Sequence, residues 1–510
     1  MSENVKIDNH RVELLVTDLC ITWLAGVIAY VFNYSMSYCL ANLGPLCRDL
    51  SLLSVFYLCG FVLWKTYNSF VRNLASNDFL YTVAGLLTGV LFSCLAIRFT
   101  EGIRLLSYRD VLLQFIVALV GLRVVRNLIS IHYYYYSKRS NTNGSYGLSD
   151  MALLNMELSE LLSRSPIRVD EEGIMQEMSG KRILVTGGAG SIGSELVKNI
   201  ARFGPRKLIV IDQAETPMHD LMLDVRGNFP RLDFVCVLGD VCNKDTMKRV
   251  FERFRPQIVF HAAAYKHVSV MEENPSECIL NNVCGTMNVA DLAVAYKTEK
   301  VVLISSDKAV RPTGMMGCSK RICEIYCQSL SQNDGNPGGC QFVTTRFGNV
   351  LGSNGSVVPL FREQIRRGGP VTVTHPDVIR YFMLIDEACK LVLEAATLGH
   401  GGEIFVFDMG MPVKITDLAK KMIRISRRSD VKIEYIGLGR GEKLYEEVLT
   451  NRETELPTSN EYIRIAQVES YDFEEVKNRI SRLVSAARLN DEPEIVALMR
   501  ELVPEFKYSA

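Results

Sequence analysis

Three glycines that follow an apolar run constrain the fold of this chain more than any other feature. Residues 181–195 read KRILVTGGAGSIGSE, with glycines at Gly187, Gly190 and Gly193. The apolar run predicts a buried parallel strand that ends at this turn, and a helix should begin near Ser191 with free N–H groups directed at an anion. Glycine permits a tight turn, close approach to a pyrophosphate and close packing of the helix on the strand. The segment therefore indicates dinucleotide binding, whereas an ordinary tight turn is the alternative.

A second strand supports the dinucleotide interpretation. Residues 207–211 form an apolar run that ends in Asp212, about where a carboxylate meets an adenosine ribose. No arginine follows Asp212 directly, and a carboxylate repels a 2′-phosphate, so NAD is favoured over NADP. We expect the turn to contact the cofactor through Gly187, Gly190, Ser191, Ile192 and Gly193.

Strand and helix patterns alternate through the next part of the chain. Helical patterns at 193–203 and 281–296 lie among apolar runs, which occur at 207–211, 234–238, 257–261, 301–305 and 342–345. This alternation predicts an α/β fold with a Rossmann-type doubly wound parallel sheet. After Gly352 the pattern loosens, as expected of a smaller C-terminal substrate-binding lobe.

Four apolar stretches precede the glycine-rich turn, at roughly 12–32, 49–67, 79–97 and 111–129. Each is near the length that a helix needs to cross a bilayer. A buried core helix would explain one stretch, but four in a row with short polar loops predict a transmembrane region. Lys6 and Arg11 precede the first stretch as in a signal peptide, yet Glu13, Asp18 and three further stretches favour a retained helix.

The orientation of these helices follows from the cofactor. An even number of spans puts both ends on one side, and a dinucleotide-binding domain needs cytosolic cofactor. We therefore expect a multi-pass protein of the inner (cytoplasmic) membrane with its catalytic domain in the cytoplasm. The basic residues do not all fit this orientation under the positive-inside rule. The cytoplasmic side would hold Lys6, Arg11, Lys65, Arg72, Lys138 and Arg139, as the rule expects, but the outer side would hold Arg98, Arg104 and Arg109.

The domain plan that results has three parts. Residues 1–135 form the four-helix transmembrane region, 136–179 a polar linker with a short amphipathic segment near 153–162, and 180–510 the NAD-binding catalytic domain. Lysine plus arginine and aspartate plus glutamate both number 57, so no nucleic-acid partner is indicated. The 14 cysteines show no paired spacing, so we expect reduced thiols and no metal.

Candidate chemical groups follow the predicted strands, at the edge where open parallel sheets bind ligands. Asp240 and Val241 follow the third strand, where the carboxylate can accept from an adenine amino group. Small residues after the fourth strand let a cofactor lie flat, namely Ala262, Ala263 and Ala264. Lys266 and His267 come next and are placed to meet an anionic substrate, with a surface charge as the alternative for each.

The fifth strand ends in Ser305, Ser306, Asp307 and Lys308, and Met316 and Lys320 follow it. With these residues the chain resembles the membrane-bound nucleotide-sugar 4,6-dehydratases of the capsular-polysaccharide type, within the extended short-chain dehydrogenase/reductase superfamily. The motifs that carry the resemblance are TGGAGSIGSE, HAAAYKHV, NNVCGTMNV, SSDKAVRPTGMMGCSKR, TRFGNVLGSNGSVVPLF and GRGEKLYEE. It extends over almost the whole chain and implies homo-oligomers.

Two departures from the family pattern stand out. Full-length relatives usually carry an additional nucleotide-binding-like domain between membrane and catalytic parts, and here only about forty residues stand in its place. We therefore expect a compact form, in which regulation through that domain is in doubt. The family's STDK reads SSDK, where Ser306 keeps the hydroxyl and loses a methyl group.

Met316 lies where the wider superfamily has the tyrosine of Y-x-x-x-K, with Lys320 as the lysine. A thioether cannot accept a proton. The resembled subgroup also has methionine here, so another group must take the proton, and Asp307 and Lys308 are the candidates. A lysine beside a buried cofactor can have its pKa lowered enough to act as a base. A surface Asp-Lys pair is the alternative.

The resemblance implies internal redox chemistry on a UDP-linked N-acetylhexosamine, with UDP-GlcNAc as the expected substrate. Hydride would pass from C4 to bound NAD and return to C6 after water is lost across C5 and C6, giving a UDP-4-keto-6-deoxy sugar. Lys308 is the expected C5 base and Asp307 the acid for the C6 hydroxyl, while Lys320 holds the nicotinamide ribose. Which group accepts the C4 hydroxyl proton stays open.

Residues for the nucleotide half of the substrate come mainly from the resemblance. Arg380 and Arg440 offer planar forks suited to a diphosphate, and for each a surface salt bridge is the alternative. The other expected contacts are Asn349 to a phosphate or sugar oxygen, Glu442 to ribose hydroxyls, and Thr372, Thr374 and His375 along the uridine.

Three other functions remain open from the sequence. A dehydratase that also inverts C5 differs only in the face that is reprotonated. A nucleotide-sugar 4-epimerase would normally need the tyrosine that Met316 replaces. A non-catalytic NAD-binding membrane scaffold predicts the loss of Asp307, Lys308 or Lys320, and all three are present.

Overall fold

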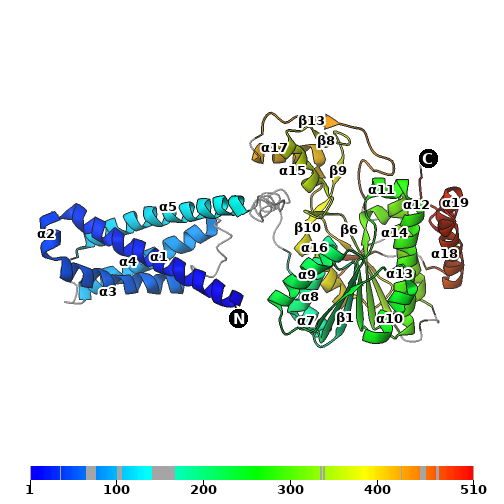
Figure 1. Cartoon of the computed structure of the whole chain (residues 1–510), viewed down its shortest axis with the longest axis horizontal. Coiled ribbons are helices and arrows are strands. Elements are labelled where there is room, and N and C mark those ends of the chain that lie inside the picture. The colour runs from blue at the N-terminus through cyan, green and yellow to red at the C-terminus, as the bar shows by residue number, and fades with distance from the viewer. Residues whose placement is uncertain are drawn as a thin grey trace. The chain divides into compact units, whose positions relative to one another are not determined.

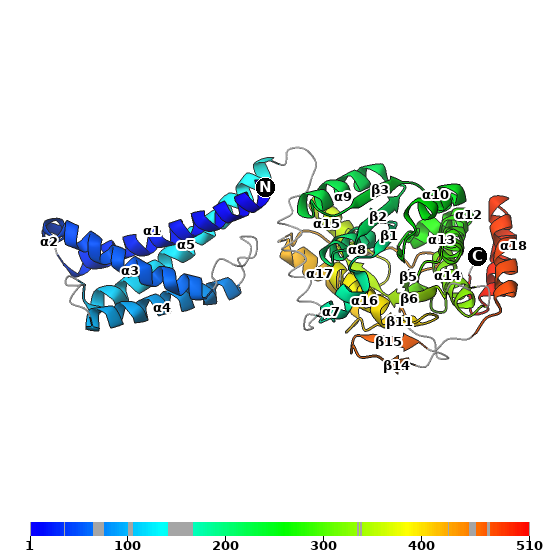
Figure 2. The same cartoon turned by 90° about the horizontal axis from the view of Figure 1, so that it is seen from below.

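The computed structural model describes residues 2–34, 36–64, 76–99, 106–140, 167–333, 336, 339–426, 428–447, 455–466 and 470–508. The chain divides into two compact units, Met1–Leu154 and Asn155–Ala510 (Figures 1 and 2). The amphipathic segment predicted near 153–162 lies outside the described residues. Each unit is described by itself.

Four long helices build the first unit, with a short helix α2 (Met36–Ala41) between the first two. They are α1 (Ser2–Asn33), α3 (Leu43–Leu63), α4 (Ser76–Phe99) and α5 (Tyr108–Ser140). α1 packs against α5 and α3 against α4 (Figure 2). Three of the four apolar stretches predicted from the sequence fall on α1, α4 and α5, and the second falls on α3 up to Leu63, with its last residues, 65–67, outside the described part. α5 continues beyond the predicted boundary at residue 135.

Polar side chains of the first unit lie inside the bundle. The buried Gln114 side chain donates to the carbonyl of Thr22 at 2.9 Å, and the buried Asp110 carboxylate accepts from the exposed Asn33 at 2.7 Å. Large apolar side chains lie outside, among them Leu24, Ile28, Val55, Val62, Leu87, Leu91, Leu112, Ile116 and Val120. Within the described part of this unit, two segments are long and apolar enough to cross a membrane, Leu43–Leu63 and Thr82–Phe99. Polar groups inside and apolar groups outside suit a lipid surrounding.

A nine-stranded sheet forms the centre of the second unit, in the order β14-β15-β11-β6-β5-β4-β1-β2-β3. Its strands are β1 (Arg182–Thr186), β2 (Lys207–Asp212), β3 (Phe234–Leu238), β4 (Ile258–His261), β5 (Lys300–Ser306), β6 (Gln341–Phe347), β11 (Ile404–Phe407), β14 (Glu455–Pro457) and β15 (Ile463–Ala466). The strands from β3 to β11 are parallel, and β15 and β14 add antiparallel pairs. The predicted doubly wound sheet is confirmed, and its order reverses between β1 and β4, where such sheets bind ligands.

Helices cover both faces of this sheet (Figure 1). One core lies beneath α7 (Glu171–Met178), α8 (Ser191–Arg202), α9 (Glu215–Asn228) and α16 (Ile385–Leu398). The other lies beneath α10 (Lys244–Phe254), α13 (Gly285–Ala295), α14 (Met315–Ser331), α18 (Phe473–Arg488) and α19 (Glu492–Leu502). The apolar helical segment Pro275–Ala295 is 67% buried, as befits a core helix.

Helix α7 lies in the segment that the sequence suggested as linker. Ile174 and Met178 on this helix are buried in the core of the second unit, and the Asp170 side chain caps it by accepting from Gly173 N at 3.0 Å. The compact second unit therefore begins before residue 180. Its eight residues are too few for a clear helical period in the sequence.

A smaller lobe of short paired strands follows the sixth strand. β7 (Asn349–Leu351) pairs with β10 (Phe382–Leu384), β8 (Val371–Val373) with β13 (Ile433–Tyr435), and β9 (Ile379–Arg380) with β12 (Val413–Lys414). Helices α15 (Val357–Arg367) and α17 (Ile415–Ile425) pack on β8. This lobe brings residues from 349–447 toward the carboxyl ends of the central strands.

Candidate active site

The glycine-rich turn between β1 and α8 leaves no room for a side chain at Gly187 or Gly193. Gly187 has φ +64°, and a Cβ there would lie 2.5 Å from the backbone nitrogen of Ala263. A Cβ on Gly193 would lie 2.1 Å from the carbonyl oxygen of Gly187. The predicted close approaches are therefore present, and α8 begins at Ser191 with its first N–H groups at this turn.

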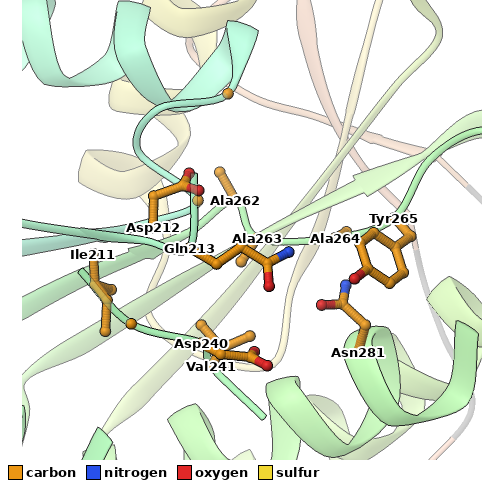
Figure 3. Close-up of a pocket in the computed structure, with 13 residues that line it drawn as sticks. Ile211, Asp212, Gln213, Asp240, Val241, Ala262, Ala263, Ala264, Tyr265 and Asn281 are labelled. Carbon is orange, nitrogen blue, oxygen red and sulfur yellow. The ribbon is translucent and has the colours of Figure 1, made fainter. Parts of the chain in front are cut away.

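A pocket lies beside this turn, over the carboxyl ends of β1 to β4. Its lining comprises Gly187, Gly190, Ile211, Asp212, Gln213, Gly239, Asp240, Val241, Ala262, Ala263, Ala264, Tyr265 and Asn281. Figure 3 shows Asp212 and Gln213 on one side of it, and Tyr265 and Asn281 at its other end. Eight of these residues were predicted as cofactor contacts from the sequence. Ser191, Ile192, Gly193 and Lys320 were also predicted and are not part of this lining.

Two carboxylates of the pocket also shape the loops that carry them. Asp212 accepts from the backbone nitrogens of Ala189 and Ala214, at 2.9 Å each. Asp240 accepts from the backbone nitrogen of Cys242 at 2.8 Å. Because a carboxylate oxygen can accept more than one hydrogen bond, Asp212 retains capacity for a ribose hydroxyl.

Sequence reasoning missed Ile211, Gln213, Gly239, Tyr265 and Asn281 as lining residues. Tyr265 and Asn281 stand inside the quoted motifs HAAAYKHV and NNVCGTMNV, which were the available signal. The neighbouring Asn282 accepts from Tyr265 N at 2.7 Å and donates to the Ser319 hydroxyl at 2.9 Å. It lies in a π-helical turn, Ile279–Cys284, a distortion found frequently at functional sites.

Asp307 and Lys308 follow β5 directly, in the 3₁₀ turn Asp307–Ala309. The Lys308 amine donates to Asp307 Oδ1 and to Asn349 Oδ1, at 3.0 Å each. The Ser306 hydroxyl donates to the same Asp307 oxygen at 2.7 Å. Asp307 is fully buried, and its Oδ2 has no hydrogen-bond partner among the described residues. The structure thus brings together four predicted residues, Ser306, Asp307, Lys308 and Asn349. Asp307 Oδ2 remains as an acceptor without a partner among the described residues.

The pKa of Lys308 is raised, whereas the sequence suggested that it is lowered. Burial does lower the pKa of this amine, as expected, but the carboxylates of Asp307 and Glu446 raise it by more. A pKa lowered beside a bound cofactor stays a prediction, and sequence reasoning did not include the carboxylate of Glu446.

Met316 and Lys320 lie on the first turns of α14, and both are buried. Burial lowers the pKa of Lys320. Burial, and next the charge of Lys320, lower the pKa of His261 to about 3. The His261 ring nitrogens lie 2.7 Å from Thr186 Oγ1 and 3.0 Å from Thr286 Oγ1. His261 is therefore a neutral residue near Lys320 that stays uncharged at physiological pH.

Glu446 is the main residue of this site that sequence reasoning missed. Its Oε1 lies 3.6 Å from Lys308 Nζ and 3.6 Å from Arg380 Nε. The signal was the motif GRGEKLYEE, from which Arg440 and Glu442 alone were selected.

The two predicted diphosphate arginines have different partners. Arg380 Nη2 lies 3.0 Å from Glu442 Oε1, which also accepts from the Thr374 hydroxyl at 3.0 Å. Arg440 donates to the Tyr508 hydroxyl at 2.8 Å and lies 4.0 Å from a carboxylate oxygen of Glu272. Each arginine thus has an acidic neighbour.

The remaining predicted substrate contacts are not part of the pocket lining. Thr372 accepts from Gln364 Nε2 at 2.6 Å, and His375 Nδ1 accepts from the backbone nitrogen of Asp377 at 3.1 Å. Burial lowers the pKa of Lys266. Burial, followed by the charge of Lys266, lowers the pKa of His267. Among the described residues, no group of histidine, cysteine or carboxylate side chains is arranged to hold a metal ion.

Comparison with known proteins identifies the family. The model of the family described as "Polysaccharide biosynthesis protein" matches residues 183–468. A capsular polysaccharide biosynthesis protein of Staphylococcus aureus is 46% identical over 336 residues, which are 65% of this chain and 56% of that protein. An uncharacterized membrane protein of Methanocaldococcus jannaschii is 44% identical over 279 residues, which are 54% of this chain and 81% of that protein.

One solved structure shares both fold and sequence. The X-ray structure of Pen from Bacillus thuringiensis is 33% identical with a TM-score of 0.53, and covers 60% of this chain and 98% of that one. The matches to the first curated relatives span only about half of those proteins. Since the family model covers more than half of this chain, the chain belongs to the polysaccharide biosynthesis protein family.

Proposed function

We propose that the chain is an NAD-dependent nucleotide-sugar 4,6-dehydratase that acts on a UDP-N-acetylhexosamine, with UDP-GlcNAc as the first candidate, in polysaccharide or glycan biosynthesis. The observation that carries this proposal is the Asp307–Lys308 pair. It follows β5 in the second unit, while a buried methionine occupies position 316. Such a pair supplies proton transfer without the tyrosine of related enzymes.

The residues around the pocket fit a dinucleotide. The turn at Gly187 and Gly193 excludes any Cβ, three alanines form a flat wall, and Asp212 can accept from a ribose. Bound NAD would supply a hydride acceptor for C4 of the sugar and a hydride donor for C6. The same carboxylate at Asp212 disfavours the 2′-phosphate of NADP.

The contact between Lys308 and Asp307 explains how one pair serves as base and acid. Transfer of one proton from Lys308 to the Asp307 carboxylate, whose Oδ1 lies 3.0 Å from Nζ, would leave a neutral amine and a carboxylic acid that carries its proton on Oδ2. Neutral Lys308 then removes the C5 proton of the 4-ketone, and protonated Asp307 donates to the departing C6 hydroxyl. The unpartnered Oδ2 of Asp307 is available to that hydroxyl.

The lobe would hold the nucleotide half of the substrate. Arg380 and Arg440 have guanidinium groups suited to two phosphates, and Glu442 lies 3.0 Å from the first and Glu272 4.0 Å from the second. Lys266 and His267 follow the three alanines in the chain and are proposed to donate hydrogen bonds to the anionic substrate. Thr372 and His375 are proposed along the uridine, and Asn349 near the sugar.

The first unit is proposed as a membrane anchor of four spanning helices, with the catalytic unit in the cytoplasm. Its apolar outer surface and its internal polar contacts support this, as does the likeness to a membrane protein of Methanocaldococcus jannaschii. We further propose a compact form of the enzyme that assembles as homo-oligomers.

A proton NMR time course of the purified protein with UDP-GlcNAc in deuterated water tests the activity. A new C6 methyl signal with deuterium at C5 is expected, and the ring couplings then report whether C5 is inverted. A new UDP-hexosamine without the methyl signal would make the protein an epimerase. If NAD is shown to be bound and no sugar in a panel of UDP-sugars is converted, the non-catalytic NAD-binding scaffold would be the remaining function.

A further inference from the structure

Glu446 is a buried carboxylate to which the proposed reaction assigns no role. Its side chain is 2% exposed, and its Oε2 has no hydrogen-bond partner among the described residues. Keeping a carboxylate away from water is costly unless cations face it. Among the described residues, Lys308 and Arg380 form ion pairs with Glu446, each 3.6 Å from Oε1, and Lys443 also interacts electrostatically with this carboxylate.

The backbone that carries Glu446 is fixed to the lobe. Ile379 N donates to the carbonyl of Leu444 at 3.1 Å, and Arg380 donates to the same carbonyl at 3.3 Å. Ile379 and Tyr445 also pair as a parallel bridge. Residues 444 and 445 therefore lie beside β9, joined to it by one isolated bridge, and the carboxylate of Glu446 follows directly after them.

The charges around Lys308 come from three elements. Asp307 faces it from the 3₁₀ turn, Glu446 from the segment beside β9, and Arg380 from β9 itself. Lys443 lies nearby, where it donates to the carbonyl of Val310 at 2.7 Å. Burial lowers the pKa of the Lys308 amine, while Asp307 and next Glu446 raise it to above its ordinary value. Removing the charge of Glu446 would leave Asp307 as the one carboxylate beside the amine among the described residues.

We propose that Glu446 is a positioning residue, which holds the Lys308 amine against Asp307 and Asn349 and controls by its charge how readily that amine gives up its proton. The group acts through Lys308 and not on the sugar. Its consequence for turnover rests on the dehydratase function proposed above, whereas its effect on the amine does not.

The amine can be measured directly by trace acetylation. Full-length protein and the variants Glu446→Gln and Glu447→Gln are treated with acetic anhydride at a series of pH values, and labelled peptides are quantified by mass spectrometry. Glu447 is the matched control, because it is adjacent, partly exposed and paired with Arg311. The exposed Lys248 serves as internal standard.

We expect acetic anhydride to label Lys308 about tenfold faster in Glu446→Gln than in the wild type, at a fixed pH below the pKa of the amine. The reason is that an adjacent carboxylate favours the charged amine, which does not react. The labelling midpoint should move to lower pH, and Glu447→Gln should match the wild type. Glu446→Asp keeps the charge and should label slowly. If it labels as fast as Glu446→Gln, lost packing explains the effect and the proposal is overturned.

Turnover of UDP-GlcNAc separates this inference from the proposed function. The reactive form of the pair, with a neutral amine and a protonated Asp307, carries the same number of protons as the resting ion pair, so Glu446→Gln should change kcat at a fixed pH and leave KM nearly unchanged. A labelling shift in a protein that turns over no UDP-sugar would retain the Glu446–Lys308 coupling and remove the dehydratase. Turnover with unshifted labelling and an unchanged kcat would remove the role of Glu446.

Discussion

Glu324 on α14 and Arg346 on β6 form a fully buried ion pair, with Arg346 Nη2 2.7 Å from Glu324 Oε2 and Nε 2.8 Å from Oε1. Ser305 on β5 donates to the same carboxylate at 2.6 Å. α14 carries Met316 and Lys320, while β5 and β6 lead to Asp307 and Asn349. The ion pair therefore fastens together the elements that present the proposed catalytic groups.

Breaking this ion pair should destabilise the protein strongly. Glu324→Gln leaves Arg346 buried without its counter-charge, and such a loss typically costs about 3–5 kcal/mol. Thermal unfolding of the purified protein in detergent measures the effect. Glu363→Gln is the control, because Glu363 lies on the surface beside Arg366 and Arg367, and exposed pairs contribute about 0–1 kcal/mol. An equal loss of melting temperature in Glu324→Gln and Glu363→Gln would contradict a strong stabilising effect of the buried ion pair.

The same ion pair should make stability depend on pH. Burial raises the pKa of Glu324, but the charges of Arg346 and then Arg321 lower it by more, so that this pKa is about 2. Since the folded pKa lies below the unfolded value, the stabilisation is complete above about pH 4.5 and is lost as pH falls toward 2. The difference in melting temperature between wild type and Glu324→Gln should therefore narrow over that window. A constant difference in melting temperature down to pH 3 would show that the pKa of Glu324 is not lowered in the folded state.

Gly193 should not tolerate alanine. A Cβ would lie 2.1 Å from the Gly187 carbonyl oxygen, which is backbone and cannot rotate away. We expect Gly193→Ala to cost about 1–3 kcal/mol and to weaken NAD binding, because α8 must move from the turn. Melting temperature with and without added NAD measures both effects. Gly227→Ala on α9 is the control, since nothing lies within 4 Å of its Cβ and alanine favours helix.

The parts of this fold that the sequence predicted are those governed by local patterns. Buried strands such as β2 appear as continuous apolar runs, and the turn at Gly187 needs glycine for reasons contained within a few residues. Asp307 and Asn349 could be placed at one sheet edge because parallel strands share a direction. These signals require no knowledge of distant contacts.

The parts that could not be predicted depend on contacts between distant segments. Glu446 reaches Lys308 only because the lobe folds back along β9, so its effect on the pKa of the amine is invisible in sequence. Arg440 was paired with the nucleotide by resemblance, whereas its contact with Tyr508 depends on where the C-terminal segment lies. Helix α7 is stabilised by burial of Ile174 and Met178 and not by a long periodic pattern.

Lys308→Ala should abolish turnover and leave cofactor binding intact. The amine contacts Asp307 and Asn349 and does not line the pocket at Gly187 and Asp212, so its loss removes the proposed base without altering that pocket. Loss of a general base typically lowers kcat by about 10²–10⁴-fold. The methyl signal of the product reports turnover, and NAD released on denaturation reports the cofactor. Lys248→Ala, at an exposed position on α10, should retain both, and normal turnover in Lys308→Ala would remove Lys308 as the base.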